Sequence, residues 1–220
     1  MKKELVFTDG RLLQPGTFYG IGNNYALHAK EMGNALAAEP VVFIKPSSAY
    51  IQSGEEIIIP PISNLVHHEV ELVVVIGNEA INIDRVDANK YIAGYAVGID
   101  VTLRDLQTKN KKEGKPWAVS KGFHTSAPIS EILPIESLSG DEHIFTIELF
   151  VNGQLRQRGS TADMERPVGL LVEYLSKIFT LNPGDCIFTG TPEGVGQILP
   201  GDKLSANLSG LVSLDVSVGK

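Results

Sequence analysis

The chain has 220 residues, of which 43% are hydrophobic and 20% are charged, and its formal net charge at pH 7 is -7. These values are typical of a folded globular protein and exclude a disordered chain or a chain built from membrane spans. The excess of acidic residues also argues against binding to nucleic acid or to an anionic membrane surface.

One domain covering residues 1–220 is expected, because the sequence contains no internal repeat, linker or low-complexity tract. The N-terminus lacks an apolar stretch of signal-peptide length, which favours a cytoplasmic location. The single Cys186 cannot form an intrachain disulfide, in keeping with a reducing compartment. It lies in an apolar run, which indicates a packed and unreactive thiol.

Short β-strands dominate the predicted structure, since 22 glycines and 12 prolines supply many turns. Apolar runs bounded by turn residues predict strands at residues 41–44, 57–59, 71–76, 92–99, 144–151, 186–188 and 211–218. The sequence V-N-G-Q at 151–154 predicts a hairpin, and P-G-D at 183–185 and 200–202 predicts two type II turns. The expected fold class is β-rich α+β with a few short helices.

The first predicted helix is short. Asn23 or Asn24 is expected to cap it at the N-terminal end, and the helix is expected to run through Met32. This arrangement places Asn24, His28 and Glu31 on one face of the helix.

Further helical patterns follow along the chain. A small-residue loop at 33–40 is expected to be mobile, and residues 84–91 have a weaker helical pattern. The sequence T-L-R-D at 102–105 matches a capping box, which predicts a helix from there to the break at 114–116. An apolar stripe with steps of three and four predicts an amphipathic helix over 168–179.

Two glutamates stand at the head of a buried strand. Residues 67–72 read H-H-E-V-E-L, and the two-residue period of a strand places Glu69 and Glu71 on one face together with His67. Two such charges repel by about 3 kcal/mol at an effective dielectric constant near 20. A divalent cation would compensate this repulsion; the alternative is a hydrated face on which both glutamates are solvated.

Asp100 favours the cation. It ends the predicted strand at 92–99, and strand ends commonly present functional side chains. Three carboxylates without cysteine or paired histidine ligands form a hard oxygen site, which suits Mg²⁺ or Mn²⁺. Zinc is disfavoured because the chain has neither H-E-x-x-H nor C-x-x-C.

His28 and Glu31 form a candidate dyad, in which the carboxylate orients the imidazole so that it can accept a proton. The alternative is an exposed polar face of a short helix. Lys45 and Lys121 are candidates to contact the acids or a substrate carboxylate, although a lone lysine is by default a solvated surface group.

The loop T-G-T-P-E-G-V-G at 189–196 is rich in glycine, so its backbone N–H groups are suited to holding an anion, with the Thr191 hydroxyl as a further donor. It is not a Walker A loop, and G-I-G-N-N at 20–24 lacks the third glycine of a dinucleotide fingerprint, so nucleotide binding is rejected. Gln157 and Asp163 are candidates to support the site, although Asp163 is equally well explained as a helix cap.

Six motifs occur in a fixed order: G-N-N-Y-A-L-H-A-K-E (22–31), F-I-K-P (43–46), H-E-V-E-L (68–72), D-V-T-L-R-D-L-Q (100–107), V-N-G-Q-L-R-Q-R-G-S-T-A-D-M (151–164) and T-G-T-P-E-G-V-G (189–196). Together they resemble the fumarylacetoacetate hydrolase superfamily, and the resemblance covers nearly the whole chain. The length is similar to that of the short, single-domain branch that acts on acylpyruvates and oxaloacetate.

The resemblance implies a mixed β-sandwich roll, usually a homodimer, with Mg²⁺ or Mn²⁺ held by Glu69, Glu71 and Asp100. It also implies that His28 and Glu31 are a catalytic dyad on a segment that closes over substrate.

Further roles follow from the same resemblance. Lys121 matches a lysine near the metal. The substrate-binding positions implied are Tyr25, Lys45, Arg104, Gln107 and Thr191. One departure stands out: His124 occupies a position where the family often has Asp, which removes a negative charge close to Lys121.

The expected substrate is a small dicarboxylate or 2,4-dioxo acid that reacts through an enolate stabilised by the cation. Acylpyruvate hydrolysis and oxaloacetate decarboxylation are the main expectations. Keto–enol tautomerisation of oxaloacetate or isomerisation of a 2-hydroxyhepta-2,4-diene-1,7-dioate type of substrate is the alternative, since all of these use the same residues. A more distant alternative is a dicarboxylate-binding module without catalysis.

Overall fold

The structure is a computed structural model that describes residues 3–31, 39–140 and 143–219. The larger of its two main sheets contains, in spatial order, β12 (Leu133–Pro134), β9 (Ile92–Ile99), β8 (Val70–Ile76), β15 (Cys186–Phe188), β3 (Phe18–Gly22) and β4 (Val41–Lys45). The second main sheet contains β14 (Gln154–Ser160), β13 (Thr146–Val151), β17 (Lys203–Leu208), β18 (Val212–Val218) and β6 (Glu56–Ile57).

Smaller sheets complete the strand set. They pair β1 (Leu5–Val6) with β2 (Leu12–Leu13), β11 (Ala127–Pro128) with β5 (Tyr50–Ile51), and β10 (Thr102–Leu103) with β7 (Val66–His68) and β16 (Gly196–Gln197). The α-helices are α1 (Ala26–Glu31), α2 (Arg104–Glu113), α3 (Ala118–Lys121) and α4 (Val168–Ser176). The 3-10 turns are η1 (Ser47–Ala49), η2 (Arg85–Lys90), η3 (Ile135–Ser137) and η4 (Thr161–Asp163).

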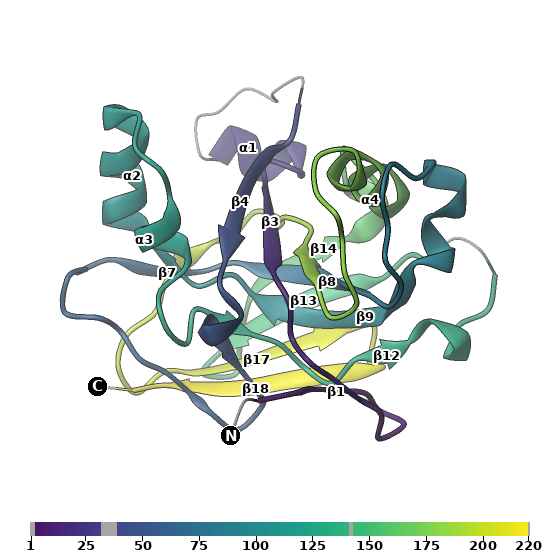
Figure 1. Cartoon of the computed structure of the whole chain (residues 1–220). Coiled ribbons are helices and arrows are strands. Elements are labelled where there is room, and N and C mark those ends of the chain that lie inside the picture. Colours follow the sequence, from purple (N-terminus) through teal and green to yellow (C-terminus); the bar gives the residue numbers. More distant parts are fainter. Residues whose placement is uncertain (1–2, 32–38, 141–142, 220) are drawn as a thin grey trace.

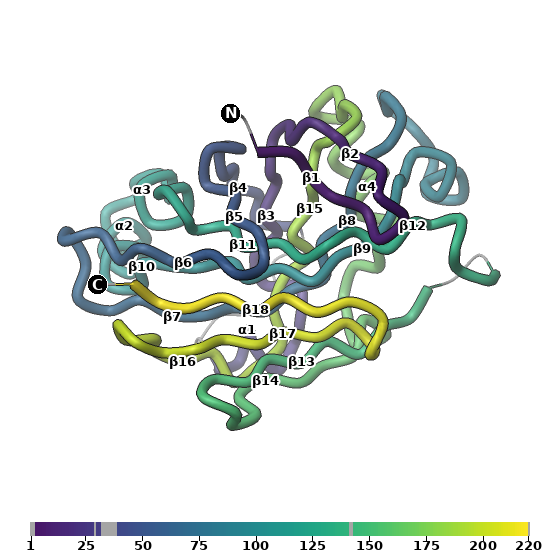
Figure 2. The backbone as a smooth tube through the Cα atoms, turned by 90° about the horizontal axis from the view of Figure 1, so that it is seen from below, coloured from purple at the N-terminus to yellow at the C-terminus, as the bar shows by residue number. Residues whose placement is uncertain are grey.

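The two main sheets form layers. In Figure 1 the yellow strands β17 and β18 lie at the bottom, β8 and β9 lie above them, and α1, α2 and α4 lie at the top. Figure 2 shows β18, β17, β13 and β14 side by side from below, which is their order in the sheet. This arrangement confirms the predicted β-rich α+β class.

The central strand β8 is buried on both faces. Leu72 and Val74 pack into the core cluster between the two main sheets, whereas Val73 packs with Phe188 in a second cluster on the opposite face. Because side chains alternate along a strand, Glu71 lies on the same face as Val73 and points away from the five-stranded sheet. The sheet therefore has an apolar inner face and presents its acidic residues on the other side.

The five-stranded sheet alternates regularly: β17 buries Leu204, Ala206 and Leu208 on the core side. The turn between β13 and β14 has Asn152 at φ 52° and Gly153 at φ 77°, as a type I′ hairpin requires. The hairpin predicted at this sequence is confirmed.

Helix α4 confirms the predicted amphipathic segment. It begins after Pro167, and it buries Leu171, Val172 and Leu175. The helix ends at Ser176, a few residues earlier than the apolar stripe indicated. None of the described helices is long and apolar enough to cross a bilayer.

The predicted capping box is wrong. Helix α2 begins at Arg104 after Leu103, without a side-chain cap. Thr102 instead belongs to a strand that pairs with β7, and its hydroxyl donates to the Asp100 carbonyl at 3.0 Å. The predicted end is correct, because Gly114 follows α2 in the left-handed region at φ 64°.

Asn24 does not cap α1 but connects distant segments. Its Oδ1 accepts the Arg166 N–H at 2.9 Å, and its Nδ2 donates to the carbonyl of Thr189 at 2.8 Å and to that of Arg166. The predicted capping role of Asn24 is therefore wrong. The predicted end at Met32 and most of the predicted loop at 33–40 lie outside the described residues.

Each of the seven predicted strands overlaps an observed strand, although the one predicted at 57–59 shares only Ile57 with β6. Strands β3, β14 and β17 are not predicted because their sequences contain glycine or many polar residues. The weaker helical pattern at 84–91 is a 3-10 turn, η2. Asp163 is exposed and lies within η4, which Ser160 caps by accepting the Ala162 N–H, so the predicted capping role of Asp163 is wrong.

The alternation of the β13–β14 hairpin predicts the stability of two leucine variants. Leu149→Ala removes a fully buried side chain and is expected to lower the free energy of unfolding by about 2–5 kcal/mol. Leu155→Ala, at a position 48% exposed on the same hairpin, is expected to change it by about 0.5 kcal/mol or less. Urea unfolding followed by circular dichroism measures both values, and equal losses would contradict the described packing.

Candidate active site

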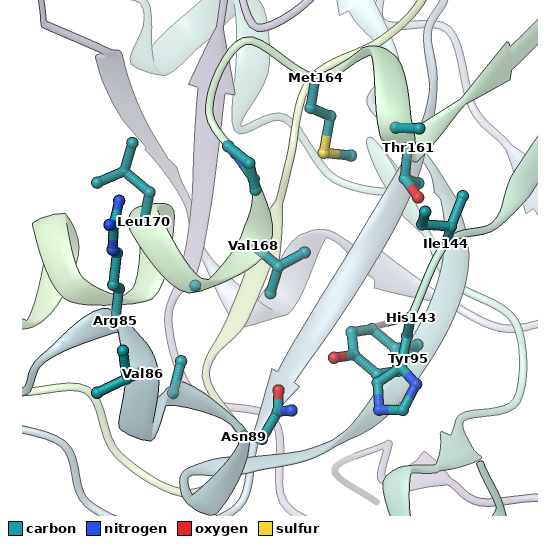
Figure 3. Close-up of a pocket in the computed structure, with 14 residues that line it drawn as sticks. Arg85, Val86, Asn89, Tyr95, His143, Ile144, Thr161, Met164, Val168 and Leu170 are labelled. Carbon is teal, nitrogen blue, oxygen red and sulfur yellow. The ribbon is translucent and has the colours of Figure 1, made fainter. Parts of the chain in front are cut away.

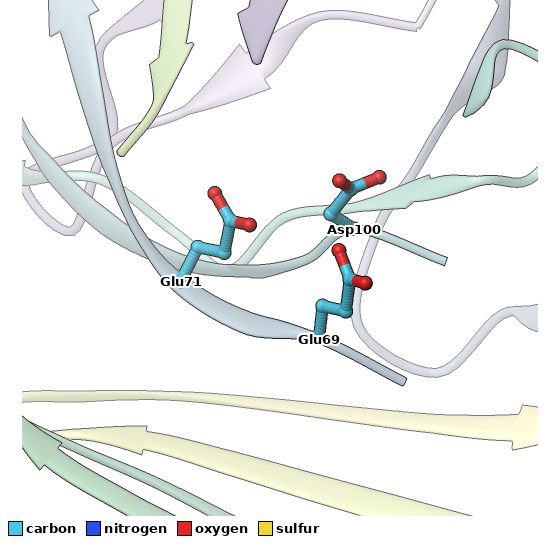
Figure 4. A group of neighbouring side chains, drawn as sticks. All are labelled: Glu69, Glu71 and Asp100. Carbon is cyan, nitrogen blue, oxygen red and sulfur yellow. The ribbon is translucent and has the colours of Figure 1, made fainter. Parts of the chain in front are cut away.

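The three predicted carboxylates meet at one point of the larger sheet. Glu69 lies at the break between β7 and β8, Glu71 lies within β8, and Asp100 directly follows the adjacent strand β9. One oxygen of each carboxylate lies within 4.8 Å of the others, and Figure 4 shows the three side chains converging. The Asp100 N–H donates to the Glu69 carbonyl at 2.8 Å, which fixes the two backbones together.

All three carboxylates are buried, with 4% exposure at Glu69, 2% at Glu71 and 0% at Asp100. The alternative of a hydrated face with solvated acids is therefore wrong. Charges removed from water in this way need compensating charges or hydrogen bonds.

Three buried cations supply most of the compensation. Lys121 Nζ lies 2.7 Å from Glu69 Oε2 and also forms an ion pair with Asp100. Arg104 pairs with Glu69, and Lys45 Nζ lies 2.7 Å from Asp100 Oδ1. The default expectation that Lys45 and Lys121 are solvated is wrong, because their exposures are 0% and 2%.

The surroundings shift the pKa values of Glu69 and Glu71 in opposite directions. Burial raises the pKa of Glu69, but the positive charges of Lys121 and Arg104 outweigh it and hold this pKa well below its usual range. Burial, together with the negative charges of Asp100 and Glu69, raises the pKa of Glu71 well above its usual value. Among the described ion pairs none includes Glu71, so this carboxylate lacks a cationic partner of its own.

The donor set fits a hard divalent cation. Asp100 Oδ1 is buried, and Lys45 Nζ lies 2.7 Å from it. Three carboxylate oxygens within 4.8 Å of one another are the kind of ligand that Mg²⁺ and Mn²⁺ prefer.

The candidate dyad is formed. His28 Nδ1 lies 3.2 Å from Glu31 Oε2, and His28 is 7% exposed, so the alternative of a fully solvated polar face is wrong for the histidine. The Gly194 N–H donates to both Glu31 oxygens at 3.2 and 3.3 Å. Glu31 therefore joins α1 to the glycine-rich loop while it contacts the imidazole.

The glycine-rich loop holds anions, as its sequence predicted, and these anions are carboxylates of the same chain. The Gly190 N–H donates to Glu71 Oε2 at 2.7 Å, and Gly194 contacts Glu31. Thr191 is buried and accepts a hydrogen bond from Gln157 Nε2 at 2.7 Å. The loop thus supports both the acidic centre and the dyad.

A small cavity of about 40 Å³ lies beside the acids. Its lining residues are Gly22, Asn23, His28, Phe43, Glu69, Asp100, Arg104, Gln107, Lys111, Trp117 and Lys121. The predicted residues Arg104 and Gln107 line this cavity, whereas Tyr25, Lys45 and Thr191 do not. Phe43 and Trp117, whose rings lie 5.9 Å apart, were not predicted, although Phe43 stands in one of the six family motifs and Trp117 is the only tryptophan.

Two further positions bear on the sequence predictions. Tyr25 is 3% exposed, and its hydroxyl has no partner among the described residues. His124 is exposed, and Lys121 is paired with Glu69 and Asp100 regardless of the residue at 124. Cys186 is fully buried, as expected for a packed thiol.

A larger cavity of about 610 Å³ lies elsewhere, between η2, α4 and β9 (Figure 3). Its wall includes Tyr95, His143, Met164 and Val168, and none of the described residues that line it is acidic. These described residues do not offer the carboxylate ligands of the smaller cavity.

Comparison with known proteins places these residues in a family. Residues 17–219 match the family model described as fumarylacetoacetate (FAA) hydrolase C-terminal. The chain is 46% identical over 209 residues to the mitochondrial oxaloacetate tautomerase FAHD1 of Arabidopsis thaliana, covering 94% of this chain and 93% of that protein. It is also 46% identical to the oxaloacetate tautomerase YcgM of Escherichia coli (strain K12), covering 86% and 87% of the two chains.

A solved structure shows the same fold. The fumarylpyruvate hydrolase of Pseudomonas aeruginosa, in complex with Mn²⁺ and pyruvate, superposes with a TM-score of 0.93 at 38% sequence identity. The match covers 99% of this chain and 96% of that chain. The predicted β-sandwich roll is confirmed by this similarity.

The acidic centre predicts stabilisation by metal. Mg²⁺ at about 100 times its dissociation constant is expected to stabilise the folded protein by about 2.7 kcal/mol, which corresponds to a rise of roughly 5–10 °C in Tm for a chain of this size. Asp100→Asn should remove most of the rise, and Asp215→Asn, at an exposed position, should retain it. A Tm unaffected by Mg²⁺ and Mn²⁺ in differential scanning calorimetry would contradict the proposed ligand set.

Proposed function

Because this chain belongs to the fumarylacetoacetate hydrolase family, we propose that it is a divalent-metal-dependent enzyme that interconverts the keto and enol forms of oxaloacetate. The observation that carries the proposal is the buried centre of Glu69, Glu71 and Asp100 beside the His28–Glu31 dyad. Tautomerisation was the alternative at the level of sequence, and the oxaloacetate tautomerases at 46% identity support it over hydrolysis and decarboxylation.

The charges of the centre match a dicarboxylate substrate. The three carboxylates and the three cations Lys45, Lys121 and Arg104 cancel formally. A divalent cation therefore adds two uncompensated positive charges, which a doubly charged 2-oxo dicarboxylate neutralises. Opposite charges in a buried site interact more strongly than in water.

Glu69, Glu71 and Asp100 are the residues that would hold the cation, and the Mn²⁺ complex of the structural relative supports this choice of metal class. When bound, the cation supplies Lewis-acid stabilisation of negative charge on substrate oxygens. Mg²⁺ and Mn²⁺ both prefer such ligands, and we propose Mg²⁺ as the native ion.

His28 is proposed as the proton carrier. Its Nδ1 faces Glu31, which leaves Nε2 to accept a proton from C3 of the substrate. The electron pair of the C3–H bond forms the C2=C3 double bond while the π pair of the C2=O bond moves onto oxygen. The proton held on Nε2 then passes to that oxygen, which gives the enol and returns His28 to its neutral form. The reverse transfers regenerate the keto acid, so atoms and charge balance in both directions.

Arg104, Gln107 and Lys121 line the cavity and are proposed to contact the substrate. A volume of about 40 Å³ holds only a few water molecules, and we propose that side chains of the wall move when a dicarboxylate binds. Tyr25, Lys45 and Thr191 lie behind this wall. Lys45 forms an ion pair with Asp100, and Thr191 is hydrogen-bonded to Gln157. We propose that Lys45 and Thr191 affect substrate binding only through Asp100 and Gln157.

Hydrolysis of acylpyruvates is a second candidate, favoured by the similarity to fumarylpyruvate hydrolase at a TM-score of 0.93. It requires a water molecule positioned for attack on the acyl carbonyl, with His28 as the base. Oxaloacetate decarboxylation uses the same centre. A dicarboxylate-binding module without turnover would need the three acids but not the dyad.

The oligomeric state and the cellular location remain predictions, the first from the family resemblance and the second from the N-terminal sequence and the single cysteine. We propose that two copies of the chain form a homodimer. Light scattering tests this by measuring the mass of the particle, which should be twice that of one chain. The cytoplasmic location stays a prediction, because the Arabidopsis relative is named mitochondrial whereas the other relative comes from Escherichia coli.

Assays of oxaloacetate, fumarylpyruvate and acetylpyruvate, each with Mg²⁺ and with EDTA, distinguish the candidate reactions. With Mg²⁺, the enzyme is expected to accelerate the loss of enol absorbance of oxaloacetate without release of pyruvate, and EDTA should abolish the effect. Pyruvate release from fumarylpyruvate or acetylpyruvate would instead show hydrolysis, and pyruvate release from oxaloacetate would show decarboxylation. No turnover of any of the three would contradict an enzymatic function and favour the binding module.

The dyad predicts a specific catalytic loss. His28→Ala is expected to lower kcat by about 10²- to 10⁴-fold, the usual contribution of a positioned acid or base. Mg²⁺ affinity should change little, since His28 is not among the three acids. His124→Ala removes an exposed histidine and serves as the matched control. Full kcat in His28→Ala would show that another group carries the proton.

A further inference from the structure

The burial of side chains along strand β14 does not follow the regular alternation of a β-strand. Leu155 is 48% exposed, whereas Gln157 is 1% exposed, although a regular strand would place both on one face. The register with β13 shifts between Leu149 and Phe150, which pair with Gln157 and Leu155, and this leaves Arg156 as an extra residue. Such a β-bulge turns Gln157 inward, and bulges commonly re-aim a side chain in this way.

The Gln157 amide makes four hydrogen bonds, its full capacity. Oε1 accepts the Val70 N–H at 3.1 Å and lies 2.8 Å from His68 Nδ1. Nε2 donates to Thr191 Oγ1 at 2.7 Å and to the Pro192 carbonyl at 2.9 Å. Because the Val70 N–H can only donate and the Pro192 carbonyl can only accept, the orientation of the amide is fixed.

The first two of these bonds lie on either side of Glu69. His68 ends β7 and Val70 begins β8, so Glu69 occupies the break between the two strands. Regular strand pairing does not extend through this break, although the Asp100 N–H donates to the Glu69 carbonyl at 2.8 Å. The Gln157 oxygen binds the residues before and after it, and thereby holds the short segment that carries the Glu69 carboxylate.

The other two bonds lead to the second glutamate. Thr191 and Pro192 belong to the glycine-rich loop, whose Gly190 N–H donates to Glu71 Oε2 at 2.7 Å. One amide therefore connects the backbone around Glu69 with the loop that holds Glu71. No other described side chain hydrogen-bonds to both segments.

We propose that Gln157 is a positioning residue that sets the spacing of the Glu69 and Glu71 carboxylates and so makes the centre selective for a small divalent cation. The inference rests on the proposed function. Groups that orient metal ligands typically change metal affinity by about 10- to 100-fold when they are removed. Mg²⁺ requires near-ideal octahedral geometry, whereas Ca²⁺ accepts flexible and longer coordination. A loosened pair of glutamates should therefore lose Mg²⁺ more than Ca²⁺.

Isothermal titration calorimetry on the full chain tests this inference. Gln157→Met retains the side-chain size and removes all four hydrogen bonds. Its Kd for Mg²⁺ is expected to rise about 10- to 100-fold, and its Kd for Ca²⁺ is expected to rise clearly less. Gln154→Met, at an exposed position of the same strand, is the matched control and should keep both constants. Circular dichroism at the titration temperature establishes that each variant is folded.

A folded Gln157→Met variant with the Mg²⁺ affinity of the unsubstituted protein would overturn the inference, and so would equal losses for both ions. If this variant does not fold, Gln157→Glu keeps the volume and an acceptor for Val70 but faces the Pro192 carbonyl with an oxygen. Its Mg²⁺ affinity is expected to be reduced, and unchanged affinity would overturn the inference. Absence of Mg²⁺ and Mn²⁺ binding by the unsubstituted protein would overturn the proposed function and this inference together.

Discussion

The burial of three carboxylates at one edge of the larger sheet is the constraint on which the rest of the structure depends. Each buried charge costs several kcal/mol unless it is paired and hydrogen-bonded. Glu69 and Asp100 share Lys121, Arg104 completes the pairing of Glu69, and Lys45 lies against Asp100. These cations come from α2, α3 and the end of β4, so the acids determine where three separate segments must pack.

Glu71 is the member that distinguishes this centre from a purely structural ion-pair cluster. Its one recorded hydrogen bond comes from the Gly190 N–H, and burial together with the neighbouring acids raises its pKa. A carboxylate in this position destabilises the protein relative to an apolar residue of similar size. Nothing in the packing of β8 requires it, because Val73 on the same face is well buried among apolar side chains. A function that needs the negative charge explains why it stands there.

The sequence predicts those features that depend on local pattern. Strand period along β8 correctly places Glu69 and Glu71 on one face, and the position of Asp100 after a strand is also local. Burial of Lys45 and Lys121 could not be predicted in this way. Lys45 pairs with Asp100, 55 residues away, and Lys121 pairs with Glu69, 52 residues away. The capping box at Thr102 failed for the same reason: pairing with β7 outweighs the local helix signal. Family resemblance supplied one of these long-range relations, since it implied that Lys121 lies near the metal ligands.

The glycine-rich loop links the candidate metal centre to the His28–Glu31 dyad. Backbone N–H groups of the loop bind Glu71 at one end and Glu31 at the other. Glu31 in turn contacts His28, so the position of the imidazole depends on the same loop that positions a candidate metal ligand. Backbone N–H groups carry no charge and do not titrate. They therefore hold both carboxylates without adding a positive charge that would compete with a bound cation for the substrate. The proposed proton carrier and the candidate metal ligands are thereby held by the same loop, which suits a reaction that moves a proton between neighbouring substrate atoms.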